Sequence, residues 1–164
     1  MNTQNLDKRM KALFEAELRN DEYKGYNHNL FRAHVRYEAA QPGPPARVSF
    51  LLTVTEPLCN KSNGLHGGCA ATLIDVTTTG LLIATSRPGM FSTGGTSRTL
   101  NLKFVRPVPR GTEVRIVNEI VHVGKRLGLV RAEIRRVDTG EVCVVGEHDK
   151  VNTDGDGNGG GARL

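Results

Sequence analysis

The sequence has only three cysteines and few aromatic residues, with no tryptophan among them, and these two shortages each argue against a class of protein. Cys59, Cys69 and Cys143 are odd in number, scattered and without CxxC spacing, which favours reduced thiols inside a cell over a disulfide framework. Aromatic residues make up 5% of the chain, and the net charge of +5 is not gathered in a dense basic block. Nucleic-acid binding by base stacking is therefore not expected, and the mild charge suits a polyanionic small molecule better.

Long hydrophobic runs are also lacking. No apolar run approaches the roughly 20 residues needed to cross a membrane, so we predict no membrane span. The N-terminal segment mixes Asp7, Glu15 and Glu17 with its basic residues and has no apolar signal region. We expect a cytoplasmic protein, with the mitochondrion as the alternative. The histidines show no zinc-ligand spacing, so we predict neither a metal nor another cofactor.

The most informative segment present is 60–75, where a His-Gly-Gly turn opens an apolar run that contains one acid, Asp75. The run continues to Ile83 with no proline before Pro88, which predicts a helix of about five turns. Gly67 and Gly68 leave backbone N–H groups bare at the positive end of the helix dipole. A carboxylate buried in an apolar helix is costly unless it has a function or a partner, although a solvent-facing Asp is the alternative. The combination indicates hydrolysis of an acyl compound.

The spacing of these residues has a geometric consequence. Asp75 lies eight residues beyond Gly67, or about 12 Å along a helix that rises about 1.5 Å per residue. A carbonyl bound to the Gly67 N–H therefore cannot also contact Asp75 of the same chain. If both belong to one site, two antiparallel copies of the helix must each supply one half. This predicts a symmetric dimer with two composite sites.

The order of expected elements is typical of an α+β protein with one domain. A surface helix is expected over 5–20, a first strand over 28–38 and a second over 48–54. After the long helix and a turn-rich loop at 87–95, four more strands are expected at 97–106, 112–123, 125–137 and 141–152. We divide the chain into a core at 46–151, an added helix and strand at 1–45, and a disordered glycine-rich tail at 152–164.

At these positions the chain resembles the hotdog-fold thioesterases, in particular the PaaI-like and small eukaryotic acyl-CoA thioesterase branch. The resemblance covers roughly 46–151 and rests on Asn60, 65–68, 71–75, 104–107 with Gly111, 124–127, and Gly140 leading to His148 and Lys150. It implies a hotdog fold, in which a five- to six-stranded antiparallel sheet wraps a long central helix. It also implies an acyl-CoA thioesterase of fatty acid metabolism that forms a homotetramer, a dimer of dimers.

Five residues are the predicted catalytic set: Asp75, Gly67, Asn60, His66 and Ser97. The Gly67 N–H would polarise the thioester carbonyl. Asp75 of the partner chain would be a general base on water or a nucleophile that forms a mixed anhydride, and partial burial would raise its basicity. By resemblance, Asn60 and His66 shape the oxyanion side and a hydroxyl positions the water. Counting back from Pro107 selects Ser97 for that hydroxyl, whereas counting forward from Asp75 selects Thr93.

The predicted CoA contacts are basic residues and a glycine at strand ends and turns: Arg106, Arg110, Gly124, Lys125, Arg126 and Lys150. Solvated surface charges are the simpler interpretation of that set. Likewise, Asn60 could cap a turn, His66 could hydrogen-bond structurally, and Cys69 is more typical of a buried thiol than of a Cys–His dyad. Two other functions stay open: a non-catalytic acyl-CoA-binding or regulatory hotdog domain, and a hotdog dehydratase or hydratase that acts on acyl thioesters. The acyl group also stays open, with Leu81, Leu82 and Phe104 as candidate pocket walls.

Overall fold

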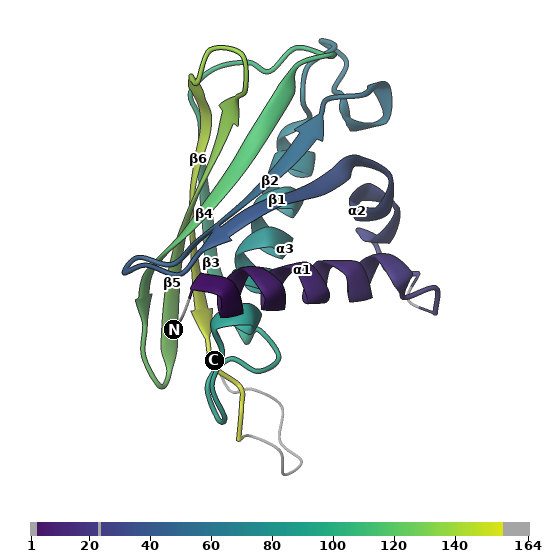
Figure 1. Cartoon of the computed structure of the whole chain (residues 1–164). Helices are drawn as coiled ribbons and strands as arrows, with labels where there is room; N and C mark the ends of the chain where they lie inside the picture. The colour runs from purple at the N-terminus through teal and green to yellow at the C-terminus, as the bar shows by residue number, and fades with distance from the viewer. Residues whose placement is uncertain (1–2, 23, 156–164) are drawn as a thin grey trace.

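The computed structural model describes residues 3–22 and 24–155 (Figure 1). Its helices are α1 (Thr3–Arg19), α2 (His28–His34) and α3 (Gly67–Thr85), with a short 3-10 turn at Glu56–Leu58. Its strands are β1 (Val35–Gln41), β2 (Arg47–Thr53), β3 (Thr96–Phe104), β4 (Glu113–Val123), β5 (Leu127–Arg136) and β6 (Val142–Val151). The long helix and the four strands that follow it lie close to the predicted ranges.

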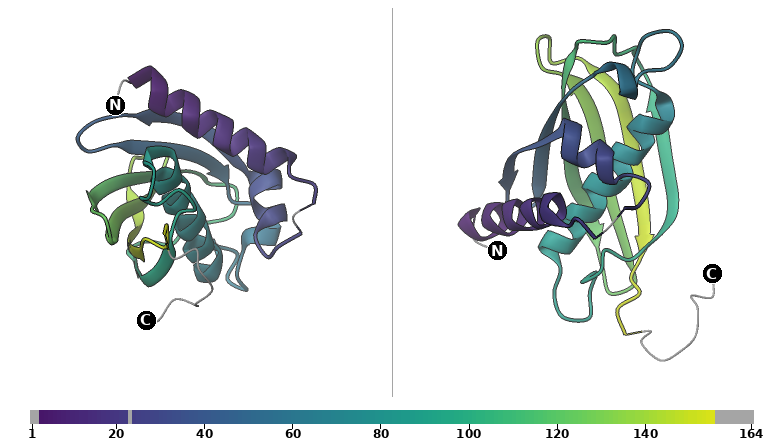
Figure 2. Two further views of the ribbon diagram at one scale, coloured as in Figure 1. Left: turned by 90° about the horizontal axis from the view of Figure 1, so that it is seen from below. Right: turned by 90° about the vertical axis from the view of Figure 1, so that its right-hand side faces the viewer.

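The six strands form one sheet in the order β1-β2-β4-β5-β6-β3, and every neighbouring pair is antiparallel. The chain leaves α3 and enters β3 at the far edge, so α3 crosses one face of the sheet while the sheet curls around it (Figure 2). This arrangement confirms the predicted α+β class and the hotdog fold.

The core lies between α3 and the sheet. Alternate residues of the strands point inward, as shown by the buried pattern of Val114, Ile116 and Asn118 on β4. Leu73 and Ile74 of α3 are completely buried against this face. Gly146 on β6 allows the close approach, because a Cβ there would lie 3.1 Å from Ile74 Cδ1.

Because α3 is both long and apolar, the prediction that no segment approaches membrane-spanning length was wrong. Among the described residues α3 is the one helix that is long and apolar enough to cross a membrane, with a mean hydropathy of 1.4. A helix that fills the centre of a curved sheet needs the same composition, so this is weak support for a span. The core contacts of Leu73 and Ile74 account for it here.

The N-terminal region differs from prediction at one element. The expected first strand over 28–38 is a helix, α2, followed by β1. His28 and Phe31 are three residues apart and both buried, a spacing that places them on one face of a helix. By contrast, α1 has the expected position, but Leu6 and Met10 are so completely buried that it is part of the core rather than a surface helix.

The segment assigned to a disordered tail begins with ordered contacts. Asn152 Oδ1 accepts a hydrogen bond from the Phe91 N–H at 2.9 Å, and Asp154 Oδ2 accepts one from the Ser92 N–H at 2.7 Å. These bonds attach the end of β6 to the loop after α3. The rest of that predicted tail, residues 156–164, lies outside the described residues.

Candidate active site

Asn60 lies in the turn that precedes α3. Its Oδ1 accepts hydrogen bonds from the backbone N–H groups of Ser62 at 3.0 Å and Gly64 at 3.2 Å, so it caps the turn. The side-chain NH₂ has no acceptor within the part of the chain that the structure describes. Turn capping and substrate contact are therefore compatible, because they use opposite ends of the same amide.

His66 is the N-cap of α3. Its Nδ1 accepts a hydrogen bond from the Gly68 N–H at 2.9 Å, which assigns the ring proton to Nε2. Its carbonyl accepts from the Ala70 N–H at 3.0 Å. The Gly67 N–H has no acceptor among residues 3–22 and 24–155, and the Phe104 ring would lie 3.3 Å from a Cβ at this position. Gly67 therefore offers a bare donor at the helix dipole, with Phe104 beside it.

Asp75 is half-buried within one protomer, between the two alternatives that the sequence left open. Its side chain is 46% exposed, because it lies on the face of α3 that points away from the centre of the sheet. Gly68, Thr72 and Thr79 follow the same stripe at helical spacing, and none of them is fully buried. Asp75 Oδ1 lies 3.5 Å from His148 Nε2. The rest of the carboxylate is open to a substrate or a second chain.

His148, on the inner face of β6, is a site residue that sequence reasoning did not select. It is completely buried and connects two hydroxyls, with Thr78 Oγ1 at 2.7 Å from Nδ1 and Ser97 Oγ at 2.9 Å from Nε2. Thr78 can donate to the Ile74 carbonyl at 2.6 Å, so its oxygen accepts from Nδ1–H. Nε2 is then the acceptor for the Ser97 hydroxyl.

The charge of His148 follows from its surroundings. Burial, aided by the Lys150 ammonium, lowers the pKa of His148 to about 4, although Asp75 acts in the opposite direction. The imidazole is neutral at physiological pH, so its 3.5 Å contact with Asp75 is not an ion pair. The alternation of residues along the predicted strand already placed the His148 side chain on the inner face of the sheet. Its partners were not visible in the sequence, because Ser97 lies 51 residues away in the chain.

The two candidates for the water-positioning hydroxyl occupy different places. Ser97 lies on β3 against His148, within the neighbourhood of Asp75. Thr93 lies beside Asp154, just beyond the end of β6, where both residues are away from Asp75. The geometry therefore favours Ser97, the residue found by counting back from Pro107.

The predicted CoA contacts fall into two groups at opposite ends of α3. Arg110 pairs with Glu56 at 3.1 Å beside the turn that begins the helix, and Arg106 pairs with Glu141 at 3.4 Å beyond the end of β3. Lys125 and Arg126 form the exposed β4–β5 turn after Gly124, at the other end of the molecule in Figure 1. Asn152 Nδ2 donates to the Lys125 carbonyl at 2.9 Å and fixes this turn.

Lys150 does not fit the predicted phosphate contact. It lies one residue before the end of β6, but it is 3% exposed and its Nζ donates to Thr79 Oγ1 at 2.7 Å on the inner face of the sheet. It sits on β6 two residues after His148, so both side chains point toward α3. An enclosed ammonium cannot reach a phosphate in solvent, which separates Lys150 from the other basic residues of that set.

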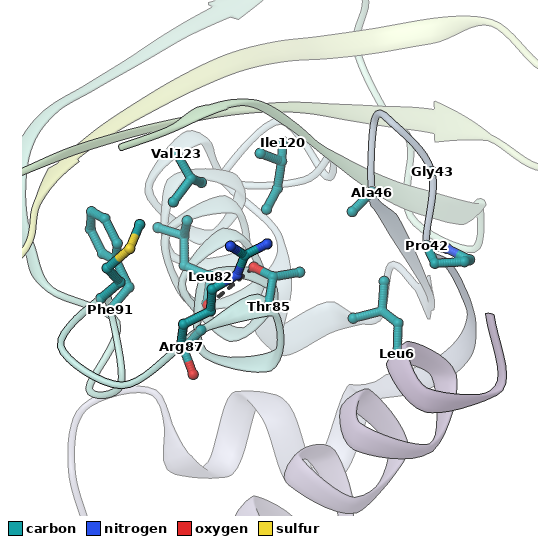
Figure 3. A pocket seen from close by; sticks show the side chains of 12 residues that line it. Leu6, Pro42, Gly43, Ala46, Leu82, Thr85, Arg87, Phe91, Ile120 and Val123 are labelled. Carbon is teal, nitrogen blue, oxygen red and sulfur yellow. Dashed lines mark hydrogen bonds between the residues drawn. The ribbon is translucent and has the colours of Figure 1, made fainter. Parts of the chain in front are cut away.

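Of the cavities that α3 lines, two lie at its ends. One of about 460 Å³ opens beside His66, Gly68 and Thr72, and Leu30 of α2 forms part of its opposite wall. The other, about 270 Å³ and drawn in Figure 3, lies at the C-terminal end of α3 between Leu82, Phe91, Ile120 and Val123, with Arg87 reaching into it. No residue of the predicted catalytic set lines the second cavity. Leu81 and Leu82 are completely buried in the core, whereas Phe104 is 59% exposed.

A long helix inside a six-stranded antiparallel sheet, with a bare Gly67 N–H at its start and a carboxylate two turns later, defines a hotdog-fold hydrolase. The chain matches the model of the thioesterase superfamily over residues 63–143, which include both Gly67 and Asp75, and the predicted resemblance to this superfamily is confirmed. It is a thioester hydrolase by class, as the sequence predicted.

Individual relatives agree with this assignment. Mouse acyl-coenzyme A thioesterase 13 is 29% identical over 148 residues, which are 90% of this chain and 94% of that protein. The crystal structure of mouse thioesterase superfamily member 2 has a TM-score of 0.69 at 27% identity and covers 92% of this chain and 98% of its own. The Escherichia coli PaaI protein has the same TM-score at 16% identity, with 90% and 95% covered, and shares the fold.

Proposed function

We propose that this protein hydrolyses acyl-CoA thioesters to the free acid and CoA in a site shared between two protomers. The name of the mouse relative supports the substrate class. The observation that carries the proposal is the exposed Asp75 carboxylate on the same helix as the bare Gly67 N–H. The two lie about 12 Å apart along the axis, too far for one carbonyl.

A dimer would complete this site. β3 is the edge of the sheet and pairs only with β6 in the described chain, and most of its residues are exposed. An edge strand of nine residues has unpaired backbone N–H and C=O groups that can pair with a strand of another chain. Two copies that pair there about a twofold axis would have their α3 helices side by side and antiparallel. Asp75 of one protomer then faces Gly67 of its partner. The tetramer implied by family resemblance remains a prediction.

The chemistry follows from the positions of three groups. The Gly67 N–H of one protomer polarises the thioester carbonyl. In the other protomer, Ser97 donates a hydrogen bond to His148 Nε2 and offers its oxygen lone pairs to a water beside Asp75. Asp75 removes a proton from that water while the water oxygen forms a bond to the carbonyl carbon. When the C–S bond breaks, the CoA sulfur takes this proton, and Asp75 returns to its ionised form.

The two groups of basic residues suit the CoA end of such a substrate. In an antiparallel pair, the C-terminal end of one α3 lies near the N-terminal end of its partner. Lys125 and Arg126 of one protomer would therefore approach Arg106 and Arg110 of the other. Phosphates held between them would direct the acyl group inward, and the cavity of about 460 Å³ beside His66 is our candidate for its tail.

The direct test is incubation of the pure protein with acyl-CoAs and a thiol-reactive dye. A thioesterase releases free CoA, whereas a non-catalytic binding domain retains intact acyl-CoA and a dehydratase alters the acyl chain without releasing a thiol. Asp75→Asn protein is the matched control. Rapid-quench mass spectrometry then distinguishes the two roles of Asp75. A chain that gains the acyl mass during the first turnover indicates the mixed anhydride and contradicts the general-base route.

A further inference from the structure

Lys150 is a buried cation that the proposed chemistry does not use. It is 3% exposed, and in the β6 register it lies between Ser97 of β3 and Gly128 of β5, neither of which carries a charge. The ammonium makes one hydrogen bond, to Thr79 Oγ1, and no ion pair within the described chain. Burial of an ammonium without a salt bridge costs several kcal/mol, so a buried lysine of this kind points to a function.

The ammonium contacts the turn of α3 that begins at Asp75. Thr79 Oγ1 donates to the Asp75 carbonyl oxygen at 2.7 Å and accepts from Lys150 Nζ at 2.7 Å, so one hydroxyl connects the cation to the backbone of the proposed base. His148 lies on the same face of β6 and contacts Asp75 Oδ1. Asp75 thus has a cation and an imidazole on its protein side and open space on the other.

We propose that Lys150 is a positioning residue of the thioesterase site, whose buried ammonium attracts the Asp75 side chain and keeps His148 neutral. The inference rests on the proposed function. Its chemical logic is that a neutral His148 can accept a hydrogen bond from the Ser97 hydroxyl, while Asp75 accepts the proton of water. A cation placed behind both groups attracts the Asp75 side chain and repels a second positive charge on the imidazole.

The electrostatics of the surrounding groups agree with this role. Burial lowers the pKa of Lys150 while Asp75 raises it, and Lys150 in turn lowers the pKa of His148. The titratable groups that face Lys150 are Asp75 on α3 and His148 on β6. The neighbouring Asp149 points to the opposite face of the sheet, where it pairs with Arg98 at 3.3 Å.

The test compares Lys150→Met with Lys125→Met, which removes an exposed cation from the β4–β5 turn. Titration of the His148 ring by NMR should show a pKa raised by about one unit or more in Lys150→Met and unchanged in Lys125→Met. For acyl-CoA hydrolysis at pH 7, Lys150→Met should lower kcat about 10- to 100-fold, with KM within about threefold. Lys150→Arg should restore part of kcat. A raised KM with an unchanged His148 titration would instead make Lys150 a CoA contact and overturn the inference.

A second measurement does not depend on the folding of a Lys150 variant. With lysines labelled at Cε, the pKa of Lys150 should be lower in Asp75→Asn than in the wild type, because the variant removes the opposing charge. An unchanged value would show that the two groups do not interact and would also overturn the inference. If the coupling is present but acyl-CoA is not hydrolysed, the proposed function fails while the electrostatic contact between Lys150 and Asp75 stands.

Discussion

The two faces of α3 have opposite properties. Leu73, Ile74 and Leu81 point to the sheet and are completely buried, whereas Thr72, Asp75 and Thr79 point away from its centre and are partly exposed. The first face is made of apolar side chains whose contacts lie within one protomer. The second face is polar, and its carboxylate has unused hydrogen-bonding capacity. Substitutions on the first face should therefore lower the free energy of unfolding, and those on the second should lower activity.

The largest effect is expected for Asp75→Asn, which keeps the shape of the side chain but removes the proton acceptor. The value of kcat should fall about 10²- to 10⁴-fold, the range for loss of a general base. The free energy of unfolding should change by less than about 1 kcal/mol, since the group is half-exposed. Steady-state kinetics and urea unfolding measure the two effects. A variant that keeps more than a tenth of the wild-type kcat would place the base elsewhere, with Cys69 as the next residue to examine.

Leu73→Ala is the matched control on the opposite face. Leu73 is completely buried, and truncation of such a leucine typically costs about 2–5 kcal/mol. The folded fraction should nevertheless retain its kcat, because Leu73 does not point toward the proposed substrate. If Leu73→Ala reduced kcat as strongly as Asp75→Asn, the functional division between the two faces would be lost.

The second prediction tests whether the polar face needs a partner. Gly67→Pro removes the N–H donor at a helix position where proline is tolerated, and Asp75→Asn removes the base, so each variant alone should be inactive. A mixed dimer contains one site with both groups intact. Mixing the two variants should therefore restore up to about half of the wild-type activity per mixed dimer. Verified subunit exchange without recovery would contradict a shared site.

The third prediction concerns the exposed β4–β5 turn. Lys125→Ala/Arg126→Ala should raise KM for acyl-CoA several-fold and leave kcat within a few-fold, because phosphate contacts are similar in the ground state and the transition state. Added salt should weaken wild-type binding more than that of the double variant. A short thioester without the nucleotide should not distinguish the two proteins. If the double variant raised KM for the short thioester as much as for acyl-CoA, Lys125 and Arg126 would have a structural role and would not contact CoA.

The smallest effect is expected where α1 docks on β1. Asp7 Oδ1 accepts hydrogen bonds from the Tyr37 hydroxyl at 2.5 Å and the Ala40 N–H at 2.9 Å, and these lower the pKa of Asp7. A carboxylate whose pKa is lower in the folded state than in the unfolded state stabilises the fold at any pH above its unfolded-state pKa. This stabilisation is lost as the pH falls through the folded-state pKa. Asp7→Asn should therefore cost about 1 kcal/mol at pH 7. In urea unfolding, the difference from the wild type should shrink below about pH 4; a constant difference would mean that the charge of Asp7 is not involved.

Local patterns in the sequence were sufficient for most of the fold. The apolar run after Gly67 predicted α3, and alternation with turn signals predicted β2 to β6, because side-chain periodicity directly reflects which face is buried. The first strand was wrong where α2 occurs, since a segment of seven residues contains too few turns for its period to be recognised. Family resemblance supplied the closure into a hotdog fold.

The candidate site divides in the same way. The sequence by itself determined the Gly67–Asp75 separation, because both residues lie on one helix whose rise per residue is known. Only the tertiary structure decided that His148 lies between Thr78 and Ser97, and that Lys150 is buried against Thr79 instead of exposed at a strand end. Thr79 and Lys150 are 71 residues apart, and their contact depends on strand register and on how α3 lies across the sheet. Neither quantity is encoded in a local pattern, since both result from the packing of the whole core.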